Sequence, residues 1–351
     1  MHSVKELNRI IAHFNISEKA YDFSLLNNGL INDTYLVTSA LNPQYILQRV
    51  NHEVFKDVPG LMHNIKLVLP NLADSDYAQI HFITSNSGKN YLGLDHEYWR
   101  LMTYIEDSIT YNKTTSEKLS KEAGRIIGKF HSLLKNEEIS TYVETIPKFH
   151  DLQKRKLEFE QALKNTDQER LMIAKNAITL AYQFLEELYE LETFNLPQRI
   201  CHNDTKLNNI LFSTENDRAL CLIDLDTVMS GYFFYDFGDA VRTIANTAAE
   251  DEQDHHKITF ENNLFEAFIE GLKIHSSFLT PEEKKSLALG AVFMPFLHGL
   301  RALTDYLNKN IYYKVTHEKQ NLDRCLSLFD FAHKALQKKE YMQSVIQAKL
   351  K

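Results

Sequence analysis

The sequence contains few cysteines, and their spacing does not fit a disulfide framework. Cys201, Cys221 and Cys325 are the three cysteines among 351 residues, and no two of them form a C-x-x-C pair. An odd number of widely spaced cysteines is typical of a reducing compartment, where thiols stay free. We therefore expect a cytoplasmic protein without disulfide bonds.

Long hydrophobic runs and a basic charge balance are also missing. No stretch reaches the roughly 18 apolar residues that a transmembrane helix needs, and residues 1–15 carry charges where a signal peptide would be apolar. The net charge of −8 and the pI near 6.0 argue against nucleic acid as the main partner. We expect a protein that binds neither membranes nor nucleic acid, as a monomer or a homodimer.

The order of the predicted elements divides the chain into two lobes, for which 351 residues are sufficient. Helical spacing at 4–14 is followed by strand-like segments at 21–26, 34–38, 45–50, 79–84 and 98–103. Beyond residue 105, helical patterns dominate. We predict an α+β fold with a nucleotide-binding lobe at 1–104, built on a five-stranded antiparallel sheet. A larger, mostly helical lobe at 105–351 would hold the catalytic and substrate-binding residues.

One segment of the second lobe carries a pattern that suits phosphoryl transfer. His202, Asp204 and Asn209 form H-x-D-x-x-x-x-N, and Asp224 follows a strand pattern at 210–212 and a turn. A hairpin here would bring Asn209 and Asp224 to the same end of two strands, where they can hold Mg²⁺ against the phosphates of ATP. Asp204 would then accept a proton from a substrate hydroxyl, and His202 would orient the loop through hydrogen bonds.

The pattern also has a simpler explanation, because Asp and Asn commonly occur in turns for their backbone hydrogen bonds. The predicted hairpin, the second carboxylate at its end and the following acids Asp236 and Asp239 favour the kinase-type site. A catalytically silent nucleotide-binding protein remains the alternative of another class.

The first lobe offers candidates for contacts with the nucleotide. The turn between the first two strands contains Gly29 and Asn32, which suits a flap over phosphates but equally suits an ordinary hairpin. Arg49 on the third strand is the candidate cation for the phosphates, although an exposed strand arginine is the simpler reading. The helix predicted at 57–74 has no Glu near its middle to pair with Arg49, and Asn64 stands there instead.

Taken together, these segments resemble the aminoglycoside phosphotransferase-like kinases, and within that group the N-acetylhexosamine 1-kinases. The resemblance rests on GLINDTY (29–35), ILQRVNHEVF (46–55), HNDTKLNNILF (202–212), IDLDTVM (223–229), DFGDAVR (236–242) and RALTDYL (301–307). It implies a protein-kinase-like two-lobed fold that uses ATP and Mg²⁺ to phosphorylate a small-molecule hydroxyl.

The resemblance also implies roles for single residues. Asp204 would be the catalytic base, Asn209 and Asp224 the metal ligands, Arg49 a phosphate contact and Asp236 a brace of the catalytic loop. The substrate pocket would comprise Asp239, Arg242, Arg301 and Tyr312, each of which has a packing role as its alternative. The implied acceptor is the anomeric hydroxyl of an N-acetylhexosamine (GlcNAc or GalNAc). An aminoglycoside, choline, homoserine or another small hydroxyl compound remains open as acceptor.

Overall fold

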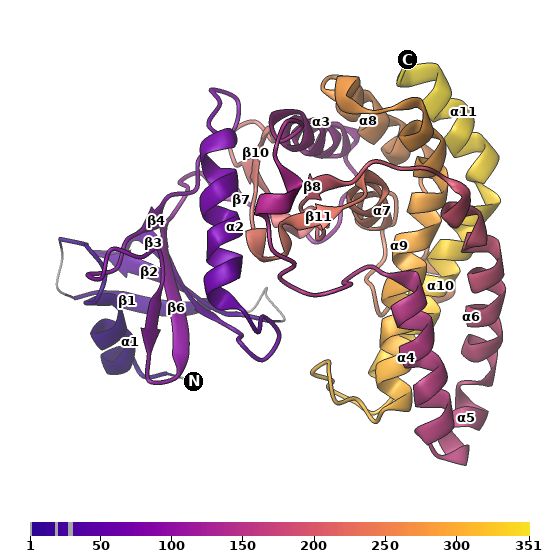
Figure 1. Cartoon of the computed structure of the whole chain (residues 1–351), viewed down its shortest axis with the longest axis horizontal. Helices are drawn as coiled ribbons and strands as arrows, with labels where there is room; N and C mark the ends of the chain where they lie inside the picture. Colours follow the sequence, from indigo (N-terminus) through magenta and orange to yellow (C-terminus); the bar gives the residue numbers. More distant parts are fainter. Residues whose placement is uncertain (1, 18–19, 27–30) are drawn as a thin grey trace.

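The computed structural model describes residues 2–17, 20–26 and 31–351, and it begins with a short helix and an antiparallel sheet (Figure 1). Helix α1 spans Val4–Ile11. The strands are β1 (Asp22–Leu26), β2 (Asp33–Ser39), β3 (Asn42–Val50), β4 (Phe82–Ile83), β5 (Leu92–Leu94) and β6 (Glu97–Thr103). They follow the order β1-β2-β3-β6-β4, with β5 paired to β6, and the pairs are antiparallel. The five predicted strands are confirmed, and β5 is an additional short strand between β4 and β6 in the sequence.

The register of β2 and β3 decides which polar side chains of β3 share a face. Thr34 lies opposite Gln48, and Asp33 lies opposite Arg49. Gln48 Nε2 donates to Thr34 Oγ1 at 3.0 Å, and Arg49 Nε donates to Asp33 Oδ2 at 2.8 Å. Because successive side chains of a strand point to opposite faces, Gln48 and Arg49 lie on different faces of the sheet.

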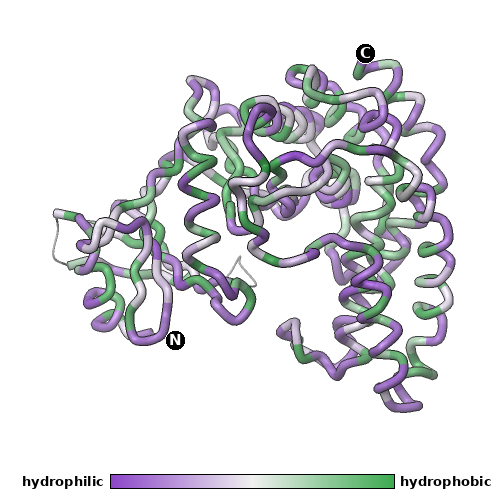
Figure 2. Tube along the Cα trace, viewed as in Figure 1, coloured by the Kyte–Doolittle hydropathy of each residue, from purple (hydrophilic) through white to green (hydrophobic). Residues whose placement is uncertain are grey.

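Helix α2, Val58–Asn71, belongs to the larger of two hydrophobic cores, which it shares with the second part of the chain and with a few sheet residues such as Val50. A small core joins α1 to side chains of the sheet such as Trp99, whereas the apolar side chains of α2 belong to the large core of the helical region. Figure 1 shows α2 standing between the sheet and that region, and Figure 2 shows hydrophilic and hydrophobic stretches along it. The lobe boundary at 104/105 remains a prediction, because the hydrophobic cores divide the chain differently.

The region after β6 is mainly helical, as predicted. Its helices are α3 (Glu117–Leu133), α4 (Leu152–Asn165), α5 (Gln168–Ile173), α6 (Lys175–Glu187), α7 (Phe233–Ile244), α8 (Asn262–Lys273), α9 (Pro281–Leu307), α10 (Gln320–Gln337) and α11 (Lys339–Lys349). Helix α9 starts with Pro281 and a capping box between Thr280 and Glu283, two features that stabilise a helix start. Among the described residues α9 is the one helix long and apolar enough to cross a membrane, but most of it is buried as a core helix.

Short strands near the middle of the molecule carry the predicted motif. β8 (Arg199–Cys201) pairs with β11 (Met229–Gly231), and β9 (Ile210–Ser213) pairs with β10 (Ala219–Leu222) and with β7 (Ser108–Ile109). Leu222 lies opposite Ile210, so Asn209 and the segment that leads to Asp224 lie at the same end of the hairpin. The predicted hairpin is therefore confirmed.

Candidate active site

The motif residues Asp204, Asn209 and Asp224 line one cavity, which we call the central cavity. Its volume is about 240 Å³, and its walls come from both the sheet and the helical region. The side-chain nitrogen of Asn209 donates to the backbone oxygen of Asp204 and to its carboxylate, both at 2.8 Å. Lys206 Nζ lies 2.9 Å from the same carboxylate. These contacts with Asn209 and Lys206 fix the position of the Asp204 carboxylate at the cavity.

The loop that carries Asp204 is held from behind by Asp236 on α7. The Asp236 carboxylate accepts the backbone N–H of His202 at 2.8 Å and that of Asn203 at 2.6 Å, and it contacts His131 at 2.8 Å. Asn203 has a left-handed backbone with φ of 63°, which is uncommon outside glycine and needs such support. These contacts give Asp236 the bracing role that the resemblance implied.

His202 is buried beside this brace and does not line the central cavity. Its Nε2 lies 2.8 Å from the backbone oxygen of Ile223, the residue before Asp224. His202 thus links the loop of Asp204 to the strand end that carries Asp224. The side chain of His202 therefore contacts the backbone next to Asp224 and lies outside the central cavity.

His131, Cys201 and Asp236 could be taken for a buried metal site, because one ligand atom of each lies within 4.8 Å of the others. Both oxygens of Asp236 already accept backbone N–H groups, however. Burial also raises the pKa of the Cys201 thiol well above its usual value, so that the thiolate a metal would bind is disfavoured. The cluster is therefore part of the brace.

Asp224 and Asp226 form the acidic end of the central cavity. Asp224 has a left-handed backbone with φ of 61°, and its side chain stays open to the cavity. The surrounding protein and the carboxylates of Asp226 and Asp204 raise the pKa of Asp224 to about 7. Carboxylates that repel one another beside the amide of Asn209 are the kind of oxygen ligands that suit Mg²⁺, which would relieve the repulsion.

The buried Asp226 is fixed from the sheet side. Arg100 Nη1 on β6 lies 2.5 Å from Asp226 Oδ1, and both side chains are only 2% exposed. Asn32 Nδ2 donates to the other oxygen of Asp226 at 2.7 Å, and Arg100 Nε donates to Gln48 at 3.0 Å. Arg100 on β6 is therefore the cation that pairs with Asp226.

Arg49 does not take the place predicted for it. Its guanidinium bonds to Asp33 and Glu97 on the other face of the sheet, and Arg49 is not among the residues that line the central cavity. Asn32 does line the cavity, whereas Gly29 lies outside the described residues. Helix α2 provides no acidic partner for a strand cation: Asn64 bonds to the backbone oxygens of Val143 and Val228 instead.

The other end of the central cavity is rich in cations and aromatic rings. Arg242, Arg301 and Tyr312, three of the four predicted substrate residues, line it together with Phe149, Glu250, His298, Tyr313, Lys314 and Arg324. The Arg301 guanidinium lies 5.0 Å from the ring centre of Phe149 and 5.9 Å from that of Tyr312. Glu250 is the one carboxylate among the described residues that line this end.

Asp239 lies behind this wall rather than in it. It is fully buried, and its Oδ1 accepts from Arg242 Nε at 2.6 Å and lies 3.3 Å from His298 Nε2. Burial alone would raise the pKa of Asp239, but the positive Arg242 and the contact with His298 hold it below its usual range. Asp239 therefore stays ionised and orients two residues of the wall.

Sequence reasoning missed several residues of the site. Asp226 and Lys206 lie within the motifs of Asp224 and Asp204, each two positions after the motif aspartate. This spacing could have identified them as residues of the site. Arg100, His298 and the brace residue His150 had no local signal, because their partners lie far away in the sequence. His150 Nε2, for example, lies 3.0 Å from the backbone oxygen of Asn203.

Comparisons with known proteins agree with this geometry. A family model described as the phosphotransferase enzyme family (APH) matches residues 22–266, more than half of the chain. Among solved structures, the chain is similar to a microcompartment-associated aminopropanol kinase, with a TM-score of 0.66 and 17% identity over 97% of this chain and 99% of that chain.

Two further similar structures were solved with nucleotides. Spectinomycin phosphotransferase APH(9)-Ia, in complex with ADP and spectinomycin, gives a TM-score of 0.65 and 12% identity over 96% of this chain and 99% of that chain. The amicoumacin kinase hAmiN, in complex with AMP-PNP, Ca²⁺ and Ami, gives a TM-score of 0.62 and 14% identity over 95% of this chain and 94% of that chain. At these identities the likeness shows a shared kinase-like fold.

Proposed function

This chain belongs to the phosphotransferase enzyme family (APH), whose model spans residues 22–266, and from that membership we propose that it transfers the γ-phosphoryl group of ATP to a small-molecule hydroxyl. One observation carries the proposal: Asp204, Asn209 and Asp224 line a single cavity. Asp204 takes the proton of the attacking hydroxyl, and Lys206 Nζ, 2.9 Å away, helps to hold its carboxylate in place.

The acidic end of the cavity supports Mg²⁺ as the metal. Asn209 and Asp224 would hold the ion, which when bound neutralises phosphate charge. Since the side-chain nitrogen of Asn209 is engaged by Asp204, its oxygen is left for a cation. Asp226 is tied to Arg100 and Asn32.

The opposite end supports a neutral sugar as the acceptor, and we propose the anomeric hydroxyl of an N-acetylhexosamine. Guanidinium groups of Arg242 and Arg301 can donate hydrogen bonds to ring hydroxyls and to an acetamido oxygen. Phe149 and Tyr312 add aromatic surface beside Arg301. A polycationic aminoglycoside would be repelled by the cations at this end of the cavity. The carboxylate of Glu250 could attract such a ligand, but it is already bonded to Arg242.

ADP production from Mg-ATP with a panel of acceptors tests this proposal. The panel contains N-acetylglucosamine, N-acetylgalactosamine, their 1-O-methyl glycosides, choline, homoserine and kanamycin. We expect turnover with the free amino sugars and none with the methyl glycosides, which lack the anomeric hydroxyl. Turnover with another acceptor alone would support the kinase activity and contradict the assignment of an amino sugar as the acceptor. Mg-ATP binding without turnover on any acceptor would instead support a silent nucleotide-binding protein.

A further inference from the structure

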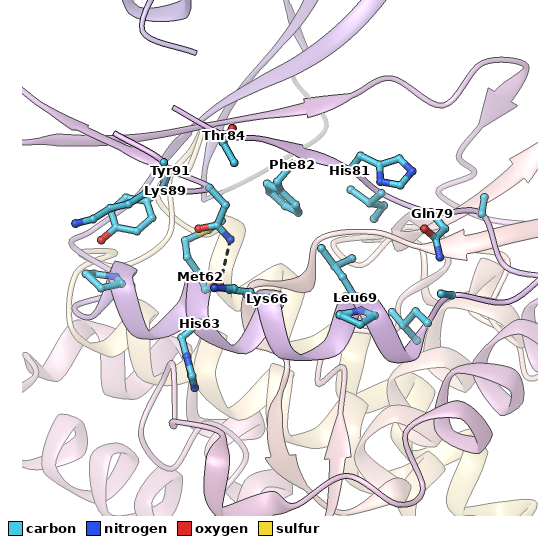
Figure 3. A pocket seen from close by; sticks show the side chains of 18 of the residues that line it. Met62, His63, Lys66, Leu69, Gln79, His81, Phe82, Thr84, Lys89 and Tyr91 are labelled. Carbon is cyan, nitrogen blue, oxygen red and sulfur yellow. Dashed lines mark hydrogen bonds between the residues drawn. The ribbon is translucent and has the colours of Figure 1, made fainter. Parts of the chain in front are cut away.

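A second and larger cavity lies between α2 and the segment 79–91, which includes β4 (Figure 3). Its volume is about 730 Å³, against about 240 Å³ for the central cavity, and the two share no lining residue among those described. A volume of this size is within the range of small-molecule sites. We call it the α2–β4 cavity.

The walls of the α2–β4 cavity combine apolar surface with positive charge. Its apolar lining includes Met62, Leu69, Leu72, Tyr77, Ile80, Phe82 and Tyr91. Lys66 on α2 and Lys89 on the opposite wall provide ammonium groups, and His81 adds an imidazole (Figure 3). No Asp or Glu lines the cavity among the described residues, although the whole chain has a net charge of −8.

These cations are not used by the protein itself. Within the described part of the chain, neither Lys66 nor Lys89 has a carboxylate partner, and Lys89 only lies 5.4 Å from the ring centre of Tyr91. Other lysines of the chain do form such pairs, for example Lys129 with Asp74 at 2.8 Å. A carboxylate-free wall with two unpaired ammonium groups favours an anionic ligand.

The α2–β4 cavity also borders Arg100, the residue that holds Asp226 at the acidic end of the central cavity. Met62 Sδ lies 3.9 Å from Arg100 Nη1, and the Arg100 guanidinium lies 5.8 Å from the ring centre of Phe82. Met62 and Phe82 both line the α2–β4 cavity, and Asn90 ties its two walls together by donating to the Met62 backbone oxygen at 3.4 Å. Arg100 in turn holds Asp226. Arg100 therefore contacts lining residues of both cavities.

From this arrangement we propose that the α2–β4 cavity binds a small organic anion with an apolar, ring-containing body. The anionic group is held by Lys66 and Lys89, and the body lies against Met62, Phe82 and Tyr91. Because Met62 and Phe82 pack on Arg100, occupancy of the cavity changes the affinity of the central cavity for nucleotide. By thermodynamic linkage, nucleotide changes the affinity for the anion by the same factor.

Binding of 8-anilinonaphthalene-1-sulfonate, an aromatic sulfonate whose fluorescence rises on transfer from water, tests the site. We expect the double variant Lys66→Glu/Lys89→Glu to raise its Kd at least about tenfold, since both ammonium groups are replaced by like charges. The control Lys5→Glu/Lys135→Glu makes the same charge change at two exposed lysines elsewhere. Equal loss in both double variants, or no loss in either, would overturn the site.

Titration of Mg-ADP into the protein with and without saturating probe tests the coupling, and this arm alone rests on the proposed function. We expect the Kd of Mg-ADP to change about 5-fold or more, the lower end of typical couplings. The change should vanish in Lys66→Glu/Lys89→Glu. Complete displacement of the probe by Mg-ADP would place the probe in the central cavity and overturn the proposal. An unchanged Mg-ADP affinity would overturn the link through Arg100, whereas no Mg-ADP binding at all would refute the proposed function instead.

Discussion

Replacing Arg100 by methionine should cost far more than the same replacement at Arg49, although both arginines lie on the same sheet. Arg100 and Asp226 are each 2% exposed, so Arg100→Met leaves a buried carboxylate without its cation. Arg49 is 35% exposed, and its partners Asp33 and Glu97 are 33% and 24% exposed. Solvent therefore screens the second pair and not the first.

The magnitudes follow from this difference in burial. Removing one partner of a buried ion pair costs about 3–5 kcal/mol, and removing one partner of an exposed pair costs at most about 1 kcal/mol. Arg100→Met also frees Asp226, which lies close enough to Asp224 to raise its pKa. We therefore expect a loss of at least about tenfold in kcat/KM for ATP, which is ~1.4 kcal/mol, and little change for Arg49→Met.

Urea denaturation and steady-state kinetics of the two variants measure both effects. If Arg49→Met lowered kcat/KM for ATP more than Arg100→Met did, Arg49 would be the phosphate-binding cation and the placement of Arg100 would be wrong. If both variants lost less than about 1 kcal/mol of unfolding free energy, Arg100 and Asp226 would not form a buried pair.

Three further predictions concern packing, protonation and the acceptor. Gly124→Ala places a Cβ 2.0 Å from the Phe268 backbone oxygen on α8 and should cost about 3 kcal/mol in urea denaturation. In Gly128→Ala, on the same face of α3, the added Cβ has its nearest atom at 3.2 Å, so the loss of unfolding free energy should be clearly smaller. Equal losses in the two variants would show that α3 and α8 do not pack this closely. Burial and the positive charges of His298 and Arg301 lower the pKa of His150 to about 3. Below pH ~6.5 His150 is therefore protonated in the unfolded chain but stays neutral in the folded chain. The unfolding free energy should fall by ~2 kcal/mol from pH 6.5 to pH 5 and should continue to fall towards pH 3. His150→Gln should remove that share of the pH dependence, and an unchanged slope would contradict a neutral His150. Arg301→Gln should raise KM for the amino sugar about 10- to 100-fold and leave KM for ATP unchanged, because a charge-assisted donor to the acceptor is lost; an effect on ATP alone would move Arg301 out of the acceptor wall.

The sequence predicted the elements whose signals are local. Strand patterns and the hairpin after Asn209 depend on neighbours within a few positions, and each is present in the structure. The motif residues Asp204, Asn209 and Asp224 were found because their spacing follows from the same hairpin.

The sequence did not show which polar side chains of a strand or helix face the central cavity. Gln48 and Arg49 are both polar, so alternation alone did not decide which of them faces the central cavity. Arg100 was overlooked because its partner Asp226 lies 126 residues away. Asp239 was expected in the substrate pocket, yet the neighbours that surround it on α7 and α9 bury it behind Arg242 and His298.

The most direct measurement compares the wild-type protein with Asp204→Asn, in turnover and in Mg-ATP binding by calorimetry. The substitution keeps the shape of the side chain and removes the proton acceptor, so kcat should fall by at least about 10²-fold while the Kd for Mg-ATP changes little. The same change at exposed Asp95, which pairs with Arg9, serves as the control and should leave both quantities unaltered. Near-normal turnover by Asp204→Asn would contradict the role of Asp204 as the base and with it the proposed kinase site.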